Sequence, residues 1–503
     1  MRVLFANKAR GALAQLPPPL HLLLLLTPLA VLQVANLAAG EGFAYTLDDP
    51  YIHLTLARNI HGGHYGINAG EWSSPSSSIL WPFLLAPFAP LPGYQYVPLV
   101  LNLLFTAAAL TVLYAFIRQQ FNRPTAAAFG ALCMAIGTNL YGLAFTGLEH
   151  SLQVLLVIII TTRYCRTNLD NVFWVALVLL PLVRYEGFAI SLPLCAYAWH
   201  AGYRRASLGA CAAMIGTCGG FSVFLLMHGL PLLPSSVLAK TDLKGLATIV
   251  QNVVDNAVSE PALFLLVVGL AAYFFHQRRW HQYFVLFASA VFFYAFGKCG
   301  GFGRYEVFFV MFVLLQAVYW WMRALHGTSR AQDARWVLRP MVWSLVCFLP
   351  LLIATMWTPT GSSNIYRQQV QMGEIARRLA APVAVNDLGV VSLRAQAYVL
   401  DLWGLGSIEA LSLRKGDPSF QWLDEFMSSK NVDVAFVYDS WITPHPPRWI
   451  RVGELVLPGR RITPASDVVS LYATNEAAAS RLREVLLQFS ASSPLAGSMT
   501  RIF

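Results

Sequence analysis

The chain has 503 residues, of which 56% are hydrophobic and 12% are charged, and its formal net charge is +10. Soluble domains carry about 25% charged residues, so the composition excludes an ordinary soluble protein and predicts a polytopic, α-helical membrane protein. The positive charge is expected where Lys and Arg mark cytoplasmic loops, and the sequence contains no nucleic-acid-binding signature.

The N-terminal region predicts an uncleaved membrane span whose N-terminus lies in the cytoplasm. The basic start "MRVLFANKAR" precedes an apolar run at 19–39. About 20 apolar residues cross a bilayer, whereas a cleaved signal peptide has a shorter apolar core and a small-residue cleavage site.

Arginines between the later apolar runs indicate which loops face the cytoplasm. With these loops inside, the chain crosses about eleven times and the loop at 40–95 lies outside. The segment 77–91 is short and holds three prolines, so we expect it to lie at the interface or to re-enter rather than to cross. The predicted spans are 19–39, 96–117, 124–146, 150–162, 171–183, 187–200, 207–228, 261–275, 283–297, 303–322 and 340–357.

The composition changes at residue 358, where charges and prolines become common and the apolar runs shorten. We expect a transmembrane catalytic domain at 1–357, which includes the outer loop, and a soluble α/β domain at 358–503 on the outer face. The expected strands are 383–387, 432–438 and 468–474, and the expected helices are 366–380 and 475–489.

This predicted membrane topology places ionisable residues from several loops on the outer side of the membrane. Ionisable residues at membrane depth are costly and usually line a cavity, so we predict a polar cavity that opens outward and is partly sunk in the bilayer. Five loops contribute Asp48 and Asp49, Glu149 and His150, Arg184 and Glu186, Lys240, and Lys298, Arg304 and Glu306.

These residues also have purely structural interpretations. Asp49 stands directly before a proline, which is a standard helix start with Asp as N-cap. Arg184 and Glu186 can pair with each other, and the lysines can extend to lipid head groups. The spacing of His61 and His64 fits a metal site, although histidines in Gly-rich loops are more often solvated.

Five short motifs follow one another along most of the chain. They are "DDPYIHLTLARNIHGGHYGIN" continued by "GEW" and "SP", then "TGLEHSL", "VRYEG", "LPSSVLAK" and "VLDLWGLGS". Their order and spacing resemble the GT-C superfamily of integral-membrane glycosyltransferases, particularly bacterial and mycobacterial arabinofuranosyltransferase-like members. Tyr185 stands where these members usually have proline, and Ser235 and Ser236 replace Asn-Thr.

The resemblance implies a bacterial inner-membrane enzyme with a periplasmic active site. It would transfer a sugar, such as the pentofuranose arabinofuranose, with inversion from a polyprenyl-phosphate donor to a glycan, lipid or protein acceptor. A carboxylate must take the proton of the attacking hydroxyl, with Asp48 the first candidate and Asp49 the second. Glu149 would stabilise the oxocarbenium-like transition state or hold a sugar hydroxyl.

The donor phosphate needs cationic partners, and arginine gives bidentate contacts. The candidates for this substrate-binding region are Arg184, Glu186, Lys240, Lys298 and Arg304. A divalent metal ion held by the acidic pair is an alternative, and no organic cofactor is expected. Candidate contacts to the acceptor or the sugar are His53, Trp72, His150, Asp401 and Trp403, although Trp72 also suits an interfacial loop and Asp401 a strand-to-turn boundary.

Three other functions fit the sequence less well. A lipid-linked-sugar transporter or flippase predicts polar residues at the bilayer midplane and inverted repeats, and neither is evident. A non-catalytic envelope-assembly subunit could share the fold with a degenerate site, whereas the acids and cations here are intact. A polymerase or ligase acting on lipid pyrophosphates usually has its large outer loop late in the chain.

Overall fold

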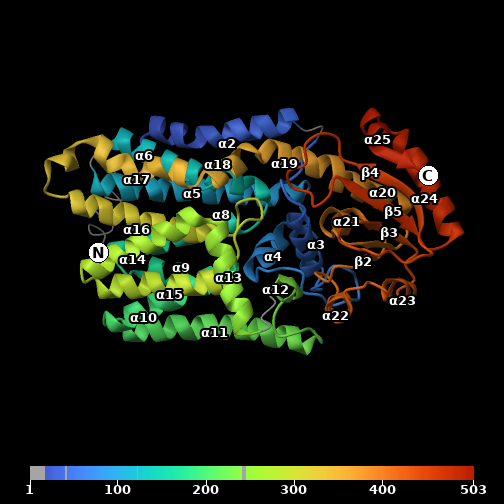
Figure 1. Ribbon diagram of the computed structural model, residues 1–503, viewed down its shortest axis with the longest axis horizontal. Coiled ribbons are helices and arrows are strands. Elements are labelled where there is room, and N and C mark those ends of the chain that lie inside the picture. Colours follow the sequence, from blue (N-terminus) through green and yellow to red (C-terminus); the bar gives the residue numbers. More distant parts are fainter. Residues whose placement is uncertain (1–16, 40–41, 122, 241–244) are drawn as a thin grey trace. The chain divides into compact units, whose positions relative to one another are not determined.

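The computed structural model describes residues 17–39, 42–121, 123–240 and 245–503 (Figure 1). Two compact units make up the chain. The first comprises Met1–Val34, Leu99–Cys218 and Leu243–Met356, and the second comprises Ala35–Pro98, Gly219–Asp242 and Trp357–Phe503. One division between the units lies between Met356 and Trp357, and the segment Ala35–Pro98, which includes the outer loop, groups with the C-terminal region. The predicted domains at 1–357 and 358–503 stay a prediction.

The first unit is built of helices, several of which are apolar on all sides. By length and composition four helices can cross a membrane, or up to seven if each bent pair counts as one span, within the part of the chain described. The count of eleven stays a prediction. The helices wholly or partly in this unit are α2 (Pro19–Ala39), α5 (Val97–Gln120), α6 (Pro124–Gly137), α7 (Leu140–Leu143), α8 (His150–Cys165), α9 (Asn171–Val183), α10 (Phe188–His200), α11 (Arg204–Met227), α13 (Leu246–Ser259), α14 (Pro261–His276), α15 (Trp280–Phe296), α16 (Val307–Leu325), α17 (Ala334–Cys347) and α18 (Leu349–Met356).

Three helix pairs in this unit are sharply bent, and the break between α6 and α7 has a clear cause. Asn139 adopts the left-handed conformation there, with φ 56°, and the helix axis turns by 65°. Its side-chain amide donates to the carbonyl oxygens of Phe302 and Gly303 and accepts from the Thr355 hydroxyl at 2.8 Å. The buried polar groups at the break are thereby satisfied without water, as a membrane interior requires.

Two predicted loops contain helices. The loop at 229–260 holds α12 (Ser235–Lys240) and α13, and α13 meets α14 at an angle of 101°. The sequence reasoning missed α13 because its 14 residues are too few for a membrane span, although Leu246, Ile249 and Val253 recur at helical spacing. The segment 77–91 forms the short helix α4 (Leu80–Leu85) and a 3₁₀ turn at Ala86–Phe88, and its interfacial or re-entrant placement stays a prediction.

The second unit contains a six-stranded sheet in the order β2-β1-β3-β5-β4-β6. The first three strands in this order are parallel, and the remaining neighbours are antiparallel. All three predicted strands are confirmed, as β1, β3 and β5, whereas the other three were not foreseen. The strands are β1 (Val383–Val385), β2 (Val399–Asp401), β3 (Val434–Val437), β4 (Ile450–Val456), β5 (Val468–Ala473) and β6 (Thr500–Ile502).

Helices cover both faces of this sheet, and alternate strand residues enter separate cores. Val383 and Val385 of β1 pack with α20 (Gln371–Leu379) and α24 (Glu476–Ser490), the two predicted helices, which lie beside the strands in Figure 1. Ala384 packs on the other side with α22 (Ile408–Gly416) and α23 (Leu423–Ser429). Ile52 and Ile67 of the outer loop belong to the first of these cores, which explains why that loop groups with the C-terminal region.

The order of the strands creates a topological switch point between β1 and β3. From β1 the chain passes through α21 (Gly389–Arg394) to β2 on one side, and from β2 it passes through α22 and α23 to β3 on the other side of β1. Ligands of open α/β sheets usually bind in the crevice at the carboxyl ends of strands at such a point.

Candidate functional site

The acidic pair lies at this switch point. Helix α3 begins at Asp49 and ends at His61, and Asp48 occupies its N-cap position without a side-chain capping bond. The carboxylate of Asp48 instead accepts from the backbone N–H of Gly389 at 2.6 Å and of Val390 at 2.8 Å. The prediction that Asp49 is the N-cap is therefore wrong, because Asp48 holds that position and Asp49 lies in the first turn, where an acid favours the helix dipole.

Gly389 is required by this close approach. A Cβ at this position would overlap the backbone oxygen and the carboxylate of Asp48. Asp48 itself is only 7% exposed, so it could not retreat into solvent. The sequence reasoning missed Gly389, although a glycine shortly after a buried strand is a recognisable signal for close backbone approach.

A second missed acid, Asp387, stands behind Asp48. The two carboxyl groups lie close enough for each to act on the pKa of the other, and the Gln369 amide donates to Oδ2 of Asp387 at 3.1 Å. The Tyr438 hydroxyl lies 3.1 Å from the same oxygen and 2.8 Å from Oε1 of Gln368. Asp387 follows β1 and Tyr438 follows β3, so the network spans the switch point.

Burial changes the acidity of both carboxyl groups. Burial raises the pKa of Asp48 well above its usual range, and the neighbouring Asp387 raises that pKa further. Burial also raises the pKa of Asp387. Two neighbouring buried carboxyl groups share a proton more readily than both ionise. Asp49 is only partly buried.

Further contacts hold the outer loop against the sheet. His53 is buried, with Nδ1 3.2 Å from the Ser76 hydroxyl. The side chain of Asn68 pairs with both the N–H and the carbonyl of Val399, at 3.0 and 2.9 Å, and so extends the edge strand β2. Trp72 is 37% exposed and its ring centroid lies 3.7 Å from that of His228.

A third motif meets the first loop in the second unit, besides the "VLDLWGLGS" motif that Asn68 contacts at Val399. Ser74 of the first loop and Ser235 of "LPSSVLAK" have hydroxyls 3.1 Å apart, and the Ser235 N–H also donates to Ser74. Lys240 ends α12, but its side chain lies outside the described residues.

Within the described residues, no cluster of metal ligands lies at the predicted metal site. Across the described residues, no three His, Cys, Asp or Glu side chains converge as metal ligands would. His64 lies 2.8 Å from a backbone oxygen of Glu71 and packs on Trp72, whereas His61 is exposed. The divalent ion stays a prediction.

In the first unit, three predicted residues form a buried ion cluster. Arg184 donates to Glu149 at 2.7 Å and to Glu186 at 2.9 Å. Glu149 is fully buried and Arg184 is 4% exposed. The structural interpretation, in which Arg184 and Glu186 pair, is therefore correct, and Glu149 joins them. A pair held this deep is expensive to break, because either charge alone would remain buried.

Tyr305 brings the third polar loop of the first unit to this cluster. The Arg304 guanidinium lies 4.7 Å from the Tyr305 ring centroid and donates to its hydroxyl at 2.7 Å. The same ring lies 5.4 Å from the Arg184 guanidinium and 6.1 Å from the His150 ring. The sequence reasoning missed Tyr305, although it stands between an arginine and a glutamate in "GRYE". Lys298 is exposed.

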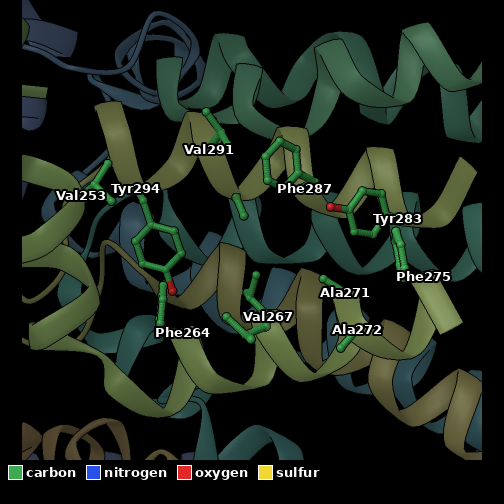
Figure 2. A pocket seen from close by; sticks show the side chains of 12 residues that line it. Val253, Phe264, Val267, Ala271, Ala272, Phe275, Tyr283, Phe287, Val291 and Tyr294 are labelled. Atoms are coloured by element: carbon green, nitrogen blue, oxygen red, sulfur yellow. The ribbon is translucent and has the colours of Figure 1, made fainter. Parts of the chain in front are cut away.

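An apolar cavity of about 580 Å³ lies between α13, α14 and α15 of the first unit (Figure 2). Its walls are aliphatic and aromatic, and the hydroxyls of Tyr283 and Tyr294 are the polar atoms visible among the drawn side chains. The labelled lining includes Val253 from α13, Phe264 from α14 and Phe287 from α15. Such a cavity suits a hydrocarbon ligand.

The "DLWGLG" turn at the end of β2 is held by its own acid. Asp401 is buried, and its carboxylate accepts from the backbone N–H of Trp403 at 2.7 Å and of Gly406 at 2.5 Å. Asp401 therefore has the structural role expected at a strand-to-turn boundary. Trp403 is half-buried, with its ring centroid 4.5 Å from that of Trp441 and 4.0 Å from the guanidinium carbon of Arg414.

Comparisons with known proteins give one family match and two solved structures to report. Residues 363–472 match a family described as a domain of unknown function (DUF8728). No curated protein sequence matches the chain. The Archaeoglobus fulgidus oligosaccharyltransferase, solved with Zn and sulfate, is similar at 14% identity and a TM-score of 0.44, over 93% of this chain and 77% of that one.

The arabinofuranosyltransferase AftD from Mycobacteria is similar at 12% identity and a TM-score of 0.39, over 90% of this chain and 41% of that one. By their names, both of these proteins are transferases of sugars.

Proposed function

We propose that this chain is a membrane glycosyltransferase that moves a sugar from a polyprenyl-phosphate donor to an acceptor hydroxyl on the periplasmic side of the inner membrane. The observation that carries the proposal is the acidic pair Asp48–Asp49, held at the switch point of the sheet by the backbone at Gly389 and Val390. Ligands of open α/β sheets bind in a crevice at such a switch point, so a carboxylate at this place can reach a bound substrate.

The reaction needs one carboxylate and one leaving group. The acceptor oxygen attacks the anomeric carbon while a carboxylate of the acidic pair takes its proton. The bond between the anomeric carbon and the phosphate oxygen breaks, and polyprenyl phosphate leaves with the bonding electrons. Attack opposite the leaving group inverts the anomeric configuration. The phosphodiester donor already carries a competent leaving group, so cations rather than a strong acid would assist its departure.

The apolar cavity supports the choice of a lipid-linked donor. Its 580 Å³ are lined by hydrocarbon side chains of α13, α14 and α15, which match a polyprenyl tail in chemistry. The cations Arg304, Lys298 and Lys240 stay the candidates for the donor phosphate that the sequence suggests. Arg184 is held by two glutamates, so its role in the proposal is to fix Glu149 and Glu186.

For the acceptor we propose contacts at the aromatic pair Trp403–Trp441, because half-buried tryptophans offer apolar faces to sugar rings. The first donor to test is a pentofuranose such as arabinofuranose, on the motif resemblance.

The test is donor turnover by purified protein. Wild type would be incubated with a panel of polyprenyl-phosphate sugars and a crude envelope extract, and free polyprenyl phosphate would be measured. We expect release with one sugar and its loss in the double variant Asp48→Asn/Asp49→Asn. Asp467→Asn, an exposed aspartate in the same unit, is the matched control. Full release by the double variant would refute the proposal, as would binding of a lipid-linked sugar without any turnover.

A further inference from the structure

We infer that the two acids of the pair have different tasks: Asp49 is the carboxylate that takes the acceptor proton, and Asp48 forms a clamp with Asp387 that positions it. This inference rests on the proposed glycosyl transfer, and it reverses the order of candidates that the sequence suggested. It makes Asp387 a positioning residue that no sequence motif indicated.

The carboxylate of Asp48 is already engaged in hydrogen bonds within the protein. Each oxygen of its carboxylate accepts a backbone N–H, one from Gly389 and one from Val390, and the carboxyl group of Asp387 is its neighbour. With 7% exposure, little of it remains for a substrate hydroxyl. Asp49 is adjacent, partly exposed and in the first turn of α3, so it can meet a substrate while the helix dipole favours its charged form.

Further polar contacts continue the clamp along α3. About two turns beyond Asp48, the Thr55 hydroxyl lies 2.9 Å from that of Ser392. Arg58 then donates to the carbonyl of Leu393 at 3.1 Å. Three successive polar contacts therefore join α3 to the segment 389–393, and they fix the direction in which the first turn presents Asp49.

The negative charges of the neighbouring acids also distinguish Asp48 from Asp49. Three acids, Asp48, Asp49 and Asp387, lie together, and full ionisation of all three at partly buried positions would be costly. Of the three, Asp49 lies in the first turn of α3, where the helix dipole favours a negative charge. The other ionisable groups around the pair are the hydroxyls of Tyr51 and Tyr438, with Arg394 acting on Tyr51.

The deciding experiment compares truncation of each acid in the full-length protein, with rescue by a small carboxylate. Asp49→Ala should lower kcat by 100-fold or more, the usual contribution of a general base, with KM nearly unchanged. Added formate should restore part of that activity, since it can replace the missing carboxylate. Asp48→Ala should lose activity and thermal stability together, and formate should not restore it. Asp467→Ala is the control for both.

Asp387→Asn keeps a side chain that can still hydrogen-bond to Asp48, so it should retain most of the activity, whereas Asp387→Leu should lose it. Rescue of Asp48→Ala by formate, with Asp49→Ala still active, would overturn the inference while leaving the proposed transfer intact.

If wild type turned over no donor, the proposed function would fail, but the clamp could still be tested by melting. The double variant Asp48→Asn/Asp387→Asn should then lower Tm by clearly less than the sum of the single changes. Additive shifts would overturn the clamp.

Discussion

Replacing Gly389 with alanine tests the closest contact in the candidate site. The added Cβ would overlap the backbone oxygen and the carboxylate of Asp48, so the start of α3 must move. The φ of Gly389 is not positive, and the effect is therefore a consequence of space rather than of backbone strain.

The expected magnitude follows from opposing contributions. Loss of hydrogen bonds to a charged group costs about 1.5–3 kcal/mol each, and overpacking costs about 1–3 kcal/mol. In the opposite direction, alanine in place of glycine stabilises a helix by roughly 1 kcal/mol. If one of the two bonds is lost, the net destabilisation is about 3 kcal/mol, or roughly 6–12 °C in Tm at the 2–4 °C per kcal/mol typical of domains of 150–250 residues.

The assay is thermal melting of full-length protein in detergent, with Gly416→Ala as the matched control. Gly416 ends α22 in the same unit, and a Cβ there meets nothing within 4 Å. We expect Gly416→Ala to melt within about 2 °C of wild type, because open sites tolerate the change. Equal melting of the two variants would refute the close approach between Gly389 and Asp48.

Three further predictions concern other contacts. Glu149→Gln should destabilise the protein by about 3–5 kcal/mol, because Arg184 would keep a buried charge with only one partner; melting measures this, and a loss below 1 kcal/mol would contradict it. Asn68→Ala should cost about 1–3 kcal/mol through its two bonds to the edge of β2, and proteolysis should then cut the loop faster; unchanged cleavage would argue against this anchoring. The hydrogen bond from Arg377 lowers the pKa of Glu374 to about 2, below its unfolded value, so Glu374 adds stability above about pH 4.5 that is lost as the pH falls toward 2. The Tm difference between wild type and Glu374→Gln should therefore shrink from pH 7 to pH 3, and a constant difference would count against it.

Local patterns were sufficient to predict the separate elements. The apolar run at 19–39 is α2, residue for residue, and the alternating segments at 383–387 and 468–474 are strands β1 and β5. These elements depend on short-range periodicity, which a single sequence displays directly. The acid pair was also recognisable, because charged residues stand out in an apolar chain.

The partners of those acids could not be predicted from a single sequence. Asp48 meets Gly389 across 341 residues, and only the strand order brings them together. The preference for Asp48 as base assumed that adjacent acids are equally accessible, whereas the fold buries one of them. Tyr305 was passed over for a related reason: its role depends on three loops meeting, which no spacing along the chain reveals.

The second unit is assembled from three separate stretches of the chain, and this has a consequence for biosynthesis. Ile52 and Ile67 pack in a core whose other members all come from residue 372 onward, and Asp48 is bonded to residues beyond 386. A ribosome releases these partners only after about three quarters of the protein has been made. Until then the acidic loop has neither its core nor its amide partners, so the nascent chain would be committed to the membrane well before it acquired a competent site.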